Sequence, residues 1–301
     1  MELIHIILIT LVILFILFLI YGYLANFRFV ITTYDIESKE LYDISNNKPF
    51  VILSDLHNCK FGKDNEKLIN AIDAISPEFI LIAGDMVNNA SEDNNQIARE
   101  LMDELQSKYN IIYGDGNHEQ GFFSDEFGEF DEKKFTSFYS YLQSETICDK
   151  VLKGNIFEHV ANSYYQVGKV RFYGIRTSRE FYGRFRQPDM SDEYISELLG
   201  DNNKEYYNVL IAHNPMYFDY YERWGADLVI SGHIHGGIMR LPYLGGVISP
   251  QIRLFPKYSG GLYTINKAKM ILSRGLGTHT IRFRFFNPPE LVVVNPINRE
   301  R

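Results

Sequence analysis

The sequence predicts an α/β protein with a largely parallel sheet, preceded by a separate apolar helix. Five short runs are apolar throughout and rich in β-branched residues, which is typical of strands covered on both faces. Amphipathic segments lie between several of these runs, and strands that alternate with helices predict βαβ units. The stretch from Leu3 to Leu24 is almost unbroken in its apolar character and stands outside this alternation. We therefore expect an α/β domain that follows an N-terminal apolar helix.

Composition limits the partners of this domain. The 301 residues are 46% hydrophobic, enough to form the core of one large α/β domain or two small ones. The net charge of −8 argues against nucleic acid as a partner, because contacts with phosphates need clustered Lys and Arg. Two cysteines, Cys59 and Cys148, are too few for a disulfide framework. The sequence implies no protein partner.

The N-terminal stretch is long enough to cross a bilayer, for which about twenty apolar residues suffice. A cleaved signal peptide is the alternative, but it would have a basic start and small residues at the cleavage site, and the sequence shows neither. We expect residues 1–28 to be a single-pass transmembrane anchor, with the lipid bilayer as its partner. Arg28 and Lys39 are too few to fix which side of the membrane bears the domain.

Residues 29–48 are mixed and polar, and we expect them to form a short lead-in to the domain at 49–301. A strand is indicated around residues 28–33. If the lead-in is a flexible tether, its length corresponds to roughly 25–30 Å r.m.s.. The domain would then stay close to the membrane.

Periodicity places the elements of the domain. Strands are predicted at 50–54, 79–83, 110–113, 162–167, 170–174, 208–212, 227–230, 261–265, 269–273, 281–286 and 291–295. Helices are predicted at 65–75, 91–108 and 191–199. The aromatic and acidic segment 120–150 is either a helix at 133–144 that packs on the domain or a flap beside a functional site. Residues 239–252 are expected to be an apolar loop.

Arg184 and Arg186 alternate with aromatic residues in the segment before the helix at 191–199. Guanidinium groups suit phosphate, and aromatic neighbours suit a lipid-water boundary, so these two arginines are candidate substrate-binding residues. A solvated surface loop is the alternative, because charged connections are common on protein surfaces.

Each of the five apolar runs ends at side chains that can bind a metal ion. The metal-competent side chains at these ends are Asp55, His57, Asp85, Asp115, Asn117, His118, Glu119, His213, Asn214, His233 and His235. In open α/β sheets, ligands bind beyond the carboxyl ends of the strands, so these side chains are expected to face one site. Oxygen and nitrogen donors without a thiolate favour Mn²⁺, Fe²⁺ or Zn²⁺. Cys59 is expected to be a packed residue, because the donor set is complete without it.

These residues follow the order Asp-x-His, Gly-Asp, Gly-Asn-His-Glu, His and Gly-His-x-His, and in this the chain resembles the calcineurin-like metallophosphoesterases. The segments 254–263 and 273–277 are similar to the membrane-anchored bacterial branch of that superfamily. The resemblance covers nearly all of the chain after the first forty residues. It implies a sandwich of two mixed β-sheets flanked by helices.

The resemblance also implies roles for the donors. Two divalent ions are expected, one held by Asp55, His57 and His235, the other by Asn117, His213 and His233, with Asp85 as the bridge between them. His118 is implied to contact the phosphate and to protonate or stabilise the leaving oxygen, with a structural histidine that supports the ligands as the alternative. Asp115 and Glu119 are expected to support the ligands. Asn88 stands where the family often has Asp, which puts any supporting role there in doubt.

The function implied is that of a membrane-anchored metal-dependent phosphoesterase in which a hydroxide shared by two metal ions attacks a phosphodiester or pyrophosphate bond. Its substrate would be a phosphoester, either lipid-linked or a nucleotide sugar that carries acyl chains, such as a UDP-diacylglucosamine. The alternative is a noncatalytic metal-binding interaction module, which the complete ligand set disfavours. A serine or cysteine hydrolase is disfavoured because the sequence has no nucleophile-elbow motif.

Overall fold

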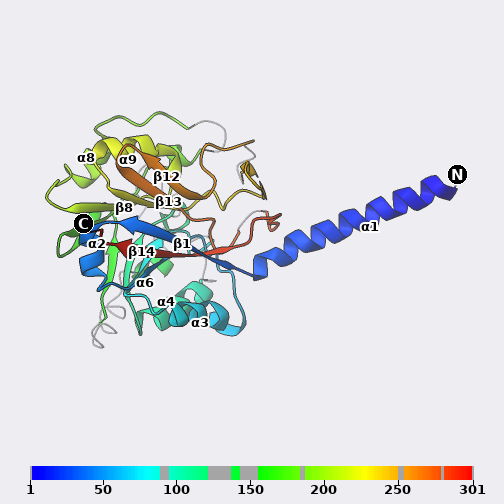
Figure 1. Ribbon diagram of the computed structural model, residues 1–301, viewed down its shortest axis with the longest axis horizontal. Coiled ribbons are helices and arrows are strands. Elements are labelled where there is room, and N and C mark those ends of the chain that lie inside the picture. The colour runs from blue at the N-terminus through cyan, green and yellow to red at the C-terminus, as the bar shows by residue number, and fades with distance from the viewer. Residues whose placement is uncertain are drawn as a thin grey trace.

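The chain folds into two packed sheets with a long helix projecting from one side (Figure 1). The computed structural model describes residues 2–88, 95–120, 137–142, 155–183, 187–249, 254–278 and 281–299. The first sheet has the order β1 (Val30–Glu37), β14 (Glu290–Ile297), β2 (Phe50–Leu53), β3 (Phe79–Ala83), β4 (Asn110–Gly114), β5 (Phe157–Val160). The second has the order β12 (Gly261–Ile265), β13 (Ala268–Leu272), β9 (Leu228–Ser231), β8 (Tyr207–Ile211), β7 (Val170–Gly174), β6 (Ser163–Val167).

Both sheets are mixed. Strands β2 to β5 are mutually parallel, while β14 runs antiparallel to β2. In the second sheet β13, β9, β8 and β7 are parallel, and the edge strands β12 and β6 are antiparallel to their neighbours. The predicted sandwich of two mixed sheets flanked by helices is therefore confirmed.

Helices cover the outer face of each sheet. The described helices of the domain are α2 (Lys39–Ile44), α3 (Glu66–Ile75), α4 (Gln96–Gln106), α5 (Asn117–Gln120), α6 (Ser137–Leu142), α8 (Tyr194–Leu199) and α9 (Phe218–Trp224). Short 3₁₀ turns lie at η1 (Ala25–Phe27), η2 (Lys63–Asn65), η5 (Arg179–Tyr182) and η6 (Pro215–Tyr217). Figure 1 shows α3 and α4 beyond one sheet and α8 and α9 beyond the other.

The alternation of side chains along each strand explains this layering. In β3, Ile80 and Ile82 face the cluster that includes Leu68 of α3 and Leu101 of α4. Leu81 faces the other way, into the cluster shared by both sheets. Strands that bury both faces need apolar residues at every position, which is why these runs are continuously apolar in the sequence. A third cluster lies between the second sheet and α8 and α9.

The N-terminal segment differs from its expected form. Residues 30–37 are not a flexible tether, because they form the edge strand β1, paired in parallel with β14. A lone strand gives little sequence signal when its pairing partner lies some 260 residues away along the chain. The N-terminal apolar helix is therefore connected to the sheet almost directly, through η1.

The segment 281–286 is not the strand that its alternation predicted. Within it, only Phe285 makes an isolated bridge, to Met239. The left-handed backbone of Phe286 (φ 53°) turns the chain out of extended geometry. The segment 239–252, expected to be a loop, instead contains the hairpin of β10 (Met239–Leu241) and β11 (Gly245–Ile248) among its described residues.

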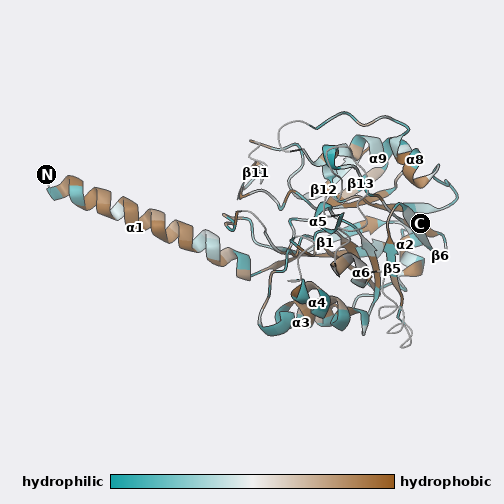
Figure 2. Ribbon diagram, turned by 180° about the vertical axis from the view of Figure 1, so that it is seen from behind, coloured by the Kyte–Doolittle hydropathy of each residue, from teal (hydrophilic) through white to brown (hydrophobic). Residues whose placement is uncertain are grey.

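Helix α1 (Glu2–Leu24) is by length and composition able to cross a membrane, and its most apolar part is exposed throughout (Figure 2). The C-terminal end of α1 with η1, which we call the foot of α1, packs against the segment 282–286. The backbone N–H of Arg284 donates to the carbonyl of Gly22 at 2.9 Å, and Asn26 Nδ2 donates to the carbonyl of Arg282 at 3.0 Å. Phe18 stacks on Phe285 with 4.2 Å between ring centroids.

Candidate metal centre

The sandwich brings the carboxyl ends of five parallel strands to one edge, and the predicted donors gather there. Asp55 follows β2, Asp85 follows β3, and Asn117 opens α5 after β4. From the second sheet, His213 follows β8, and the turn that bears His233 and His235 follows β9. Among the described residues, three overlapping groups could hold a metal ion: Asp55, His57 and His235; His57, Asp85 and His118; and Asp85, His213 and His233.

The first of these groups is compact and buried. His57 Nε2 lies 3.9 Å from Asp55 Oδ1 and 3.8 Å from Asp85 Oδ2. His235 Nε2 lies 3.5 Å from Asp55 Oδ1 and 3.3 Å from His57 Nε2. Two imidazole lone pairs this close repel each other unless a proton or a cation lies between them. The arrangement therefore suits a bound cation.

On the other side of Asp85, His213 takes a similar position. Its Nε2 lies 2.9 Å from Asp85 Oδ2 and 3.7 Å from Asp55 Oδ1. Tyr182 covers this part of the site, with its ring centroid 5.0 Å from that of His233. Asp85 thus lies between the two histidine groups.

Backbone carbonyls orient three of the imidazoles. Nδ1 of His57 lies 3.2 Å from the carbonyl oxygen of Val87, that of His213 2.6 Å from Ala83, and that of His235 3.0 Å from Gly277. A carbonyl can only accept, so each ring is protonated at Nδ1 and directs the lone pair of Nε2 toward the carboxylates. This pattern is typical of metal-binding histidines.

Five of the donors have a left-handed backbone conformation. Asp55, His57, Asp85, His233 and His235 all have φ between 48° and 73°. A left-handed conformation costs a non-glycine residue on the order of 1–3 kcal/mol. Five such residues at one edge of the sheets indicate that the turns are shaped to direct side chains.

Close packing of two turns explains the glycines of the motifs. A Cβ on Gly84 would lie 2.1 Å from the backbone nitrogen of Gly116, and one on Gly116 would lie 2.2 Å from Asp85 Oδ1. Any side chain at either position would push apart the loops after β3 and β4. Asp85 and Asn117 come from these two loops, so the glycines keep them within reach of one site.

The donors present fit divalent cations of the expected kind. Asn117 Oδ1 is buried and has no hydrogen-bond partner among the residues that the structure describes, which is costly unless a cation or water occupies the space before it. None of the described groups that could hold a metal includes a thiolate. Cys59 is packed near Gly277, as a Cβ built there would lie 2.7 Å from its Sγ.

The charges of the site are tightly linked. Burial raises the pKa of Asp55 to about 6, against the opposing effect of His213. Burial also acts to raise the pKa of Asp85, but His213 and His118 outweigh it and hold that pKa well below its usual range. Burial disfavours the charged form of His213, yet Asp85 and Asp55 raise its pKa to about 10. The carboxylates of Asp85 and Asp55 therefore favour positive charge at this position.

Two further carboxylates brace the loops. Glu119 accepts hydrogen bonds from the backbone of Asp85, Met86 and Gly116 at 2.7–2.8 Å and from the hydroxyl of Tyr113 at 2.8 Å. It therefore joins the loops after β3 and β4. Asp115 accepts from His159 Nε2 at 2.6 Å and from Nε of Arg176. Burial acts to raise the pKa of Asp115, but the contacts with His159 and Arg176 hold that pKa below its usual range.

His118 is more open than the donors around it, with its side chain 19% exposed. Its backbone N–H donates to Asp85 Oδ1 at 2.8 Å, and its Nε2 lies 4.0 Å from Asp85 Oδ2. Nδ1 contacts the carbonyl of Asn88. Because this contact uses the backbone, an Asn in place of Asp at 88 leaves it intact.

Two residues behind His235 had no role in the sequence-based site. Asn287 donates from Nδ2 to the carbonyls of His235 and Gly237 at 2.7 and 2.6 Å. Arg284 is fully buried and donates to the carbonyl of Gly277 at 2.7 Å. The only feature of the sequence that could have indicated the buried position of Arg284 is its place in the apolar segment 281–286. Arg184 and Arg186 lie outside the described residues.

Comparisons with known proteins agree with this geometry. The model of the family described as "Calcineurin-like phosphoesterase" matches residues 48–237. A metallophosphoesterase of Campylobacter jejuni is 25% identical over 260 residues, which are 85% of this chain and 61% of that protein. The metallophosphoesterase YkuE of Bacillus subtilis is 23% identical over 77% of this chain and 72% of its own length.

A third relative has a named substrate. The UDP-2,3-diacylglucosamine pyrophosphatase LpxG of Chlamydia trachomatis is 21% identical over 81% of this chain and 82% of its own length. The chain spans less than two thirds of the Campylobacter relative. The family match itself covers well over half of the chain and includes every predicted metal ligand. The chain therefore belongs to the calcineurin-like phosphoesterase family.

Proposed function

We propose that this protein is a membrane-anchored phosphoesterase that uses two divalent metal ions to hydrolyse a phosphodiester or pyrophosphate bond. The observation that supports the proposal is the grouping of six of the seven predicted donors, all except Asn117, at one edge of the two sheets, where backbone carbonyls orient the imidazoles of His57, His213 and His235. A noncatalytic metal-binding module would share this orientation, so the two readings are separated by hydrolysis and not by metal content.

The ligand assignment follows the two groups on either side of Asp85. Asp55, His57 and His235 would hold one ion. His213 and His233 would hold the other, together with the unpartnered Oδ1 of Asn117. Asp85 would contact both, because its Oδ2 lies within 4 Å of His57 and His213.

Two such ions, when bound, polarise phosphoryl oxygens and activate water at neutral pH. The residues of the chain do the rest. His118 has an Nε2 beside Asp85 and a partly exposed ring, so it can reach the leaving oxygen and donate a proton to it. The contact of its Nδ1 with the Asn88 carbonyl fixes the ring, and the buried walls around Asp85 exclude solvent from the reacting group.

The substrate class follows from the anchor and from the relatives. LpxG acts on a nucleotide sugar that carries acyl chains, as its name states. Helix α1 would span the bilayer and hold the metal centre near lipids. We therefore propose a lipid-linked phosphoester as the substrate, with Arg184 and Arg186 as candidate contacts for its head group.

The test is metal analysis of the purified full chain, followed by assays of phosphomonoesters, phosphodiesters and pyrophosphates, both soluble and in vesicles. We expect close to two divalent ions per chain and hydrolysis of diesters or pyrophosphates. Bound metal without hydrolysis of any member of the panel would favour the noncatalytic module. Hydrolysis that persists after complete removal of metal would refute the proposed chemistry.

A further inference from the structure

Large apolar side chains are exposed on the side of the domain that faces along α1. They surround the hairpin of β10 and β11 and comprise Leu241, Tyr243, Leu244, Leu254, Phe255 and Phe286. We call this set the hairpin surface. Exposed apolar patches of this kind are uncommon on soluble proteins unless they bind a partner.

Hydrogen bonds join the hairpin surface to the foot of α1. The backbone N–H of Arg240 donates to the carbonyl of Phe285 at 3.0 Å, and that of Phe285 donates to Ile238 at 2.9 Å. Phe285 in turn stacks on Phe18 of α1. On the far side of the hairpin, the N–H of Phe255 donates to Val247 at 2.9 Å. The hairpin surface is thus fixed relative to the helix.

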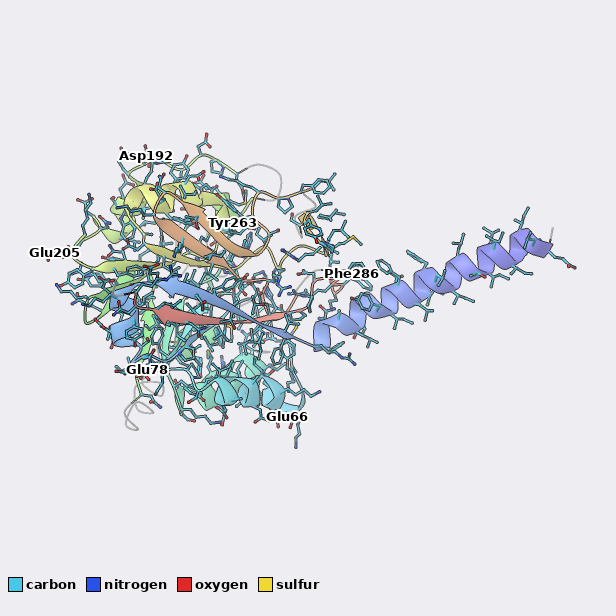
Figure 3. The ribbon with its side chains drawn as sticks, in the orientation of Figure 1. Glu66, Glu78, Asp192, Glu205, Tyr263 and Phe286 are labelled. Atoms are coloured by element: carbon cyan, nitrogen blue, oxygen red, sulfur yellow. The ribbon has the colours of Figure 1, made fainter. Side chains whose placement is uncertain are left out.

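The hairpin surface and the C-terminal end of α1 lie at a similar position along the axis of α1. Figures 1 and 2 both show α1 and the hairpin leaving the domain on the same side. Figure 3 shows Phe286 beside the foot of α1, where its ring centroid is 5.8 Å from that of Tyr21. A cavity of about 650 Å³ opens there, lined by Arg240, Leu241, Pro242, Tyr243, Gly245 and Phe286.

We propose that the hairpin surface is a second membrane contact, which enters the interfacial region of the leaflet next to the foot of α1. The inference rests on the proposed anchoring by α1. Tyr21 and Tyr23 near the end of the helix are typical of the lipid-water boundary, so a bilayer crossed by α1 has its surface at that depth. The aromatic and aliphatic side chains of the hairpin surface would then meet lipid, and the exposed Arg28 and Arg282 beside them suit anionic head groups.

Tryptophan fluorescence tests this arrangement without any assay of activity. The chain has one tryptophan, Trp224, which is 8% exposed and gives the same background in every variant. The full chain would be reconstituted in vesicles that contain lipids brominated near the head-group end of their chains, which quench nearby indoles. Leu244→Trp reports on the hairpin surface, and Leu11→Trp reports on α1. Tyr164→Trp is the matched control, because Tyr164 is 48% exposed on β6, away from α1.

We expect Leu244→Trp to be quenched and blue-shifted in vesicles, and Tyr164→Trp to be unaffected. Quenching of Leu11→Trp with no quenching of Leu244→Trp would overturn the second contact and leave the anchor in place. An absence of quenching at both positions would overturn the anchor and the second contact together. Equal quenching at Leu244→Trp and Tyr164→Trp would also overturn the inference, since it would show no orientation.

Discussion

Replacing Arg284 should weaken metal binding although this residue touches no metal ligand's side chain. Its Nη2 donates to the carbonyl of Gly277 at 2.7 Å, and the same carbonyl accepts from Nδ1 of His235 at 3.0 Å. Its Nη1 donates to the carbonyl of Arg274 at 2.9 Å. Burial lowers the pKa of Arg284 to about 10, so the side chain remains charged at neutral pH. Arg284 thus holds in place the carbonyl that orients His235.

The expected loss of stability in an Arg284→Met variant can be worked from these hydrogen bonds. Arg284→Met keeps an apolar stem in the buried site but leaves the carbonyls of Arg274 and Gly277 without this donor, at roughly 1–3 kcal/mol each. Relief from burying a charge offsets part of this loss. We expect a net loss of about 2–4 kcal/mol in the free energy of unfolding. Metal affinity should fall by roughly 10- to 100-fold, as is typical when a partner of a liganding histidine is removed.

The assay is competition for metal against a chromophoric chelator, combined with urea denaturation of the metal-free protein. Arg299→Met is the matched control, because the side chain of Arg299 is 68% exposed and lies 3.8 Å from Glu37 in a loose surface ion pair. The control should change neither quantity measurably. Wild-type metal affinity in a folded Arg284→Met protein would refute the role assigned to the Gly277 carbonyl.

Three other substitutions or truncations test separate parts of the structure. Asp85→Asn should fold but bind metal at least ~100-fold more weakly and lose nearly all hydrolysis, since the charge between both histidine groups is removed; full activity would exclude a shared ligand. His118→Ala should keep its metal content and lose roughly 10²–10⁴-fold in rate, most for esters with poor leaving groups; an equal loss for activated esters would remove the general-acid role. A chain that starts at Tyr34 lacks half of β1 and should unfold at lower urea than one that starts at Ala25, which keeps the whole strand; equal midpoints would show that β1 adds no stability.

The donors could be found from the sequence because each lies at the end of a buried strand. A strand with both faces covered is apolar at every position, so its end is visible where polar residues begin, as at Ser54 and Asp55 after β2 and at Asp85 after β3. The same logic failed at segment 281–286, whose alternation resembles a strand. There Arg284 points into the protein to bind carbonyls, and no local pattern shows which face of an isolated segment is buried.

The sequence indicated a strand only around residues 28–33, whereas β1 runs from Val30 to Glu37, and the reason is related. Its residues are mostly exposed or half-buried, with only Ile36 fully buried, so its apolar signal is weak. What makes it a strand is the register with β14, from Val30 opposite Glu290 to Glu37 opposite Ile297. A pairing between the two ends of the chain is a tertiary feature that residue patterns near position 30 do not contain.

The segment 282–287 contacts both helix α1 and the turn that bears His235. Phe285 stacks on α1, Arg284 binds the carbonyl that orients His235, and Asn287 binds the carbonyl of His235 itself. A Cβ on Gly22 would lie 2.3 Å from the ring of Phe285, so the helix approaches this segment as closely as its backbone permits. A displacement of α1 is therefore expected to disturb the segment that orients the candidate ligand His235. The helix is accordingly a part of the framework of the site, which a flexible tether could not be.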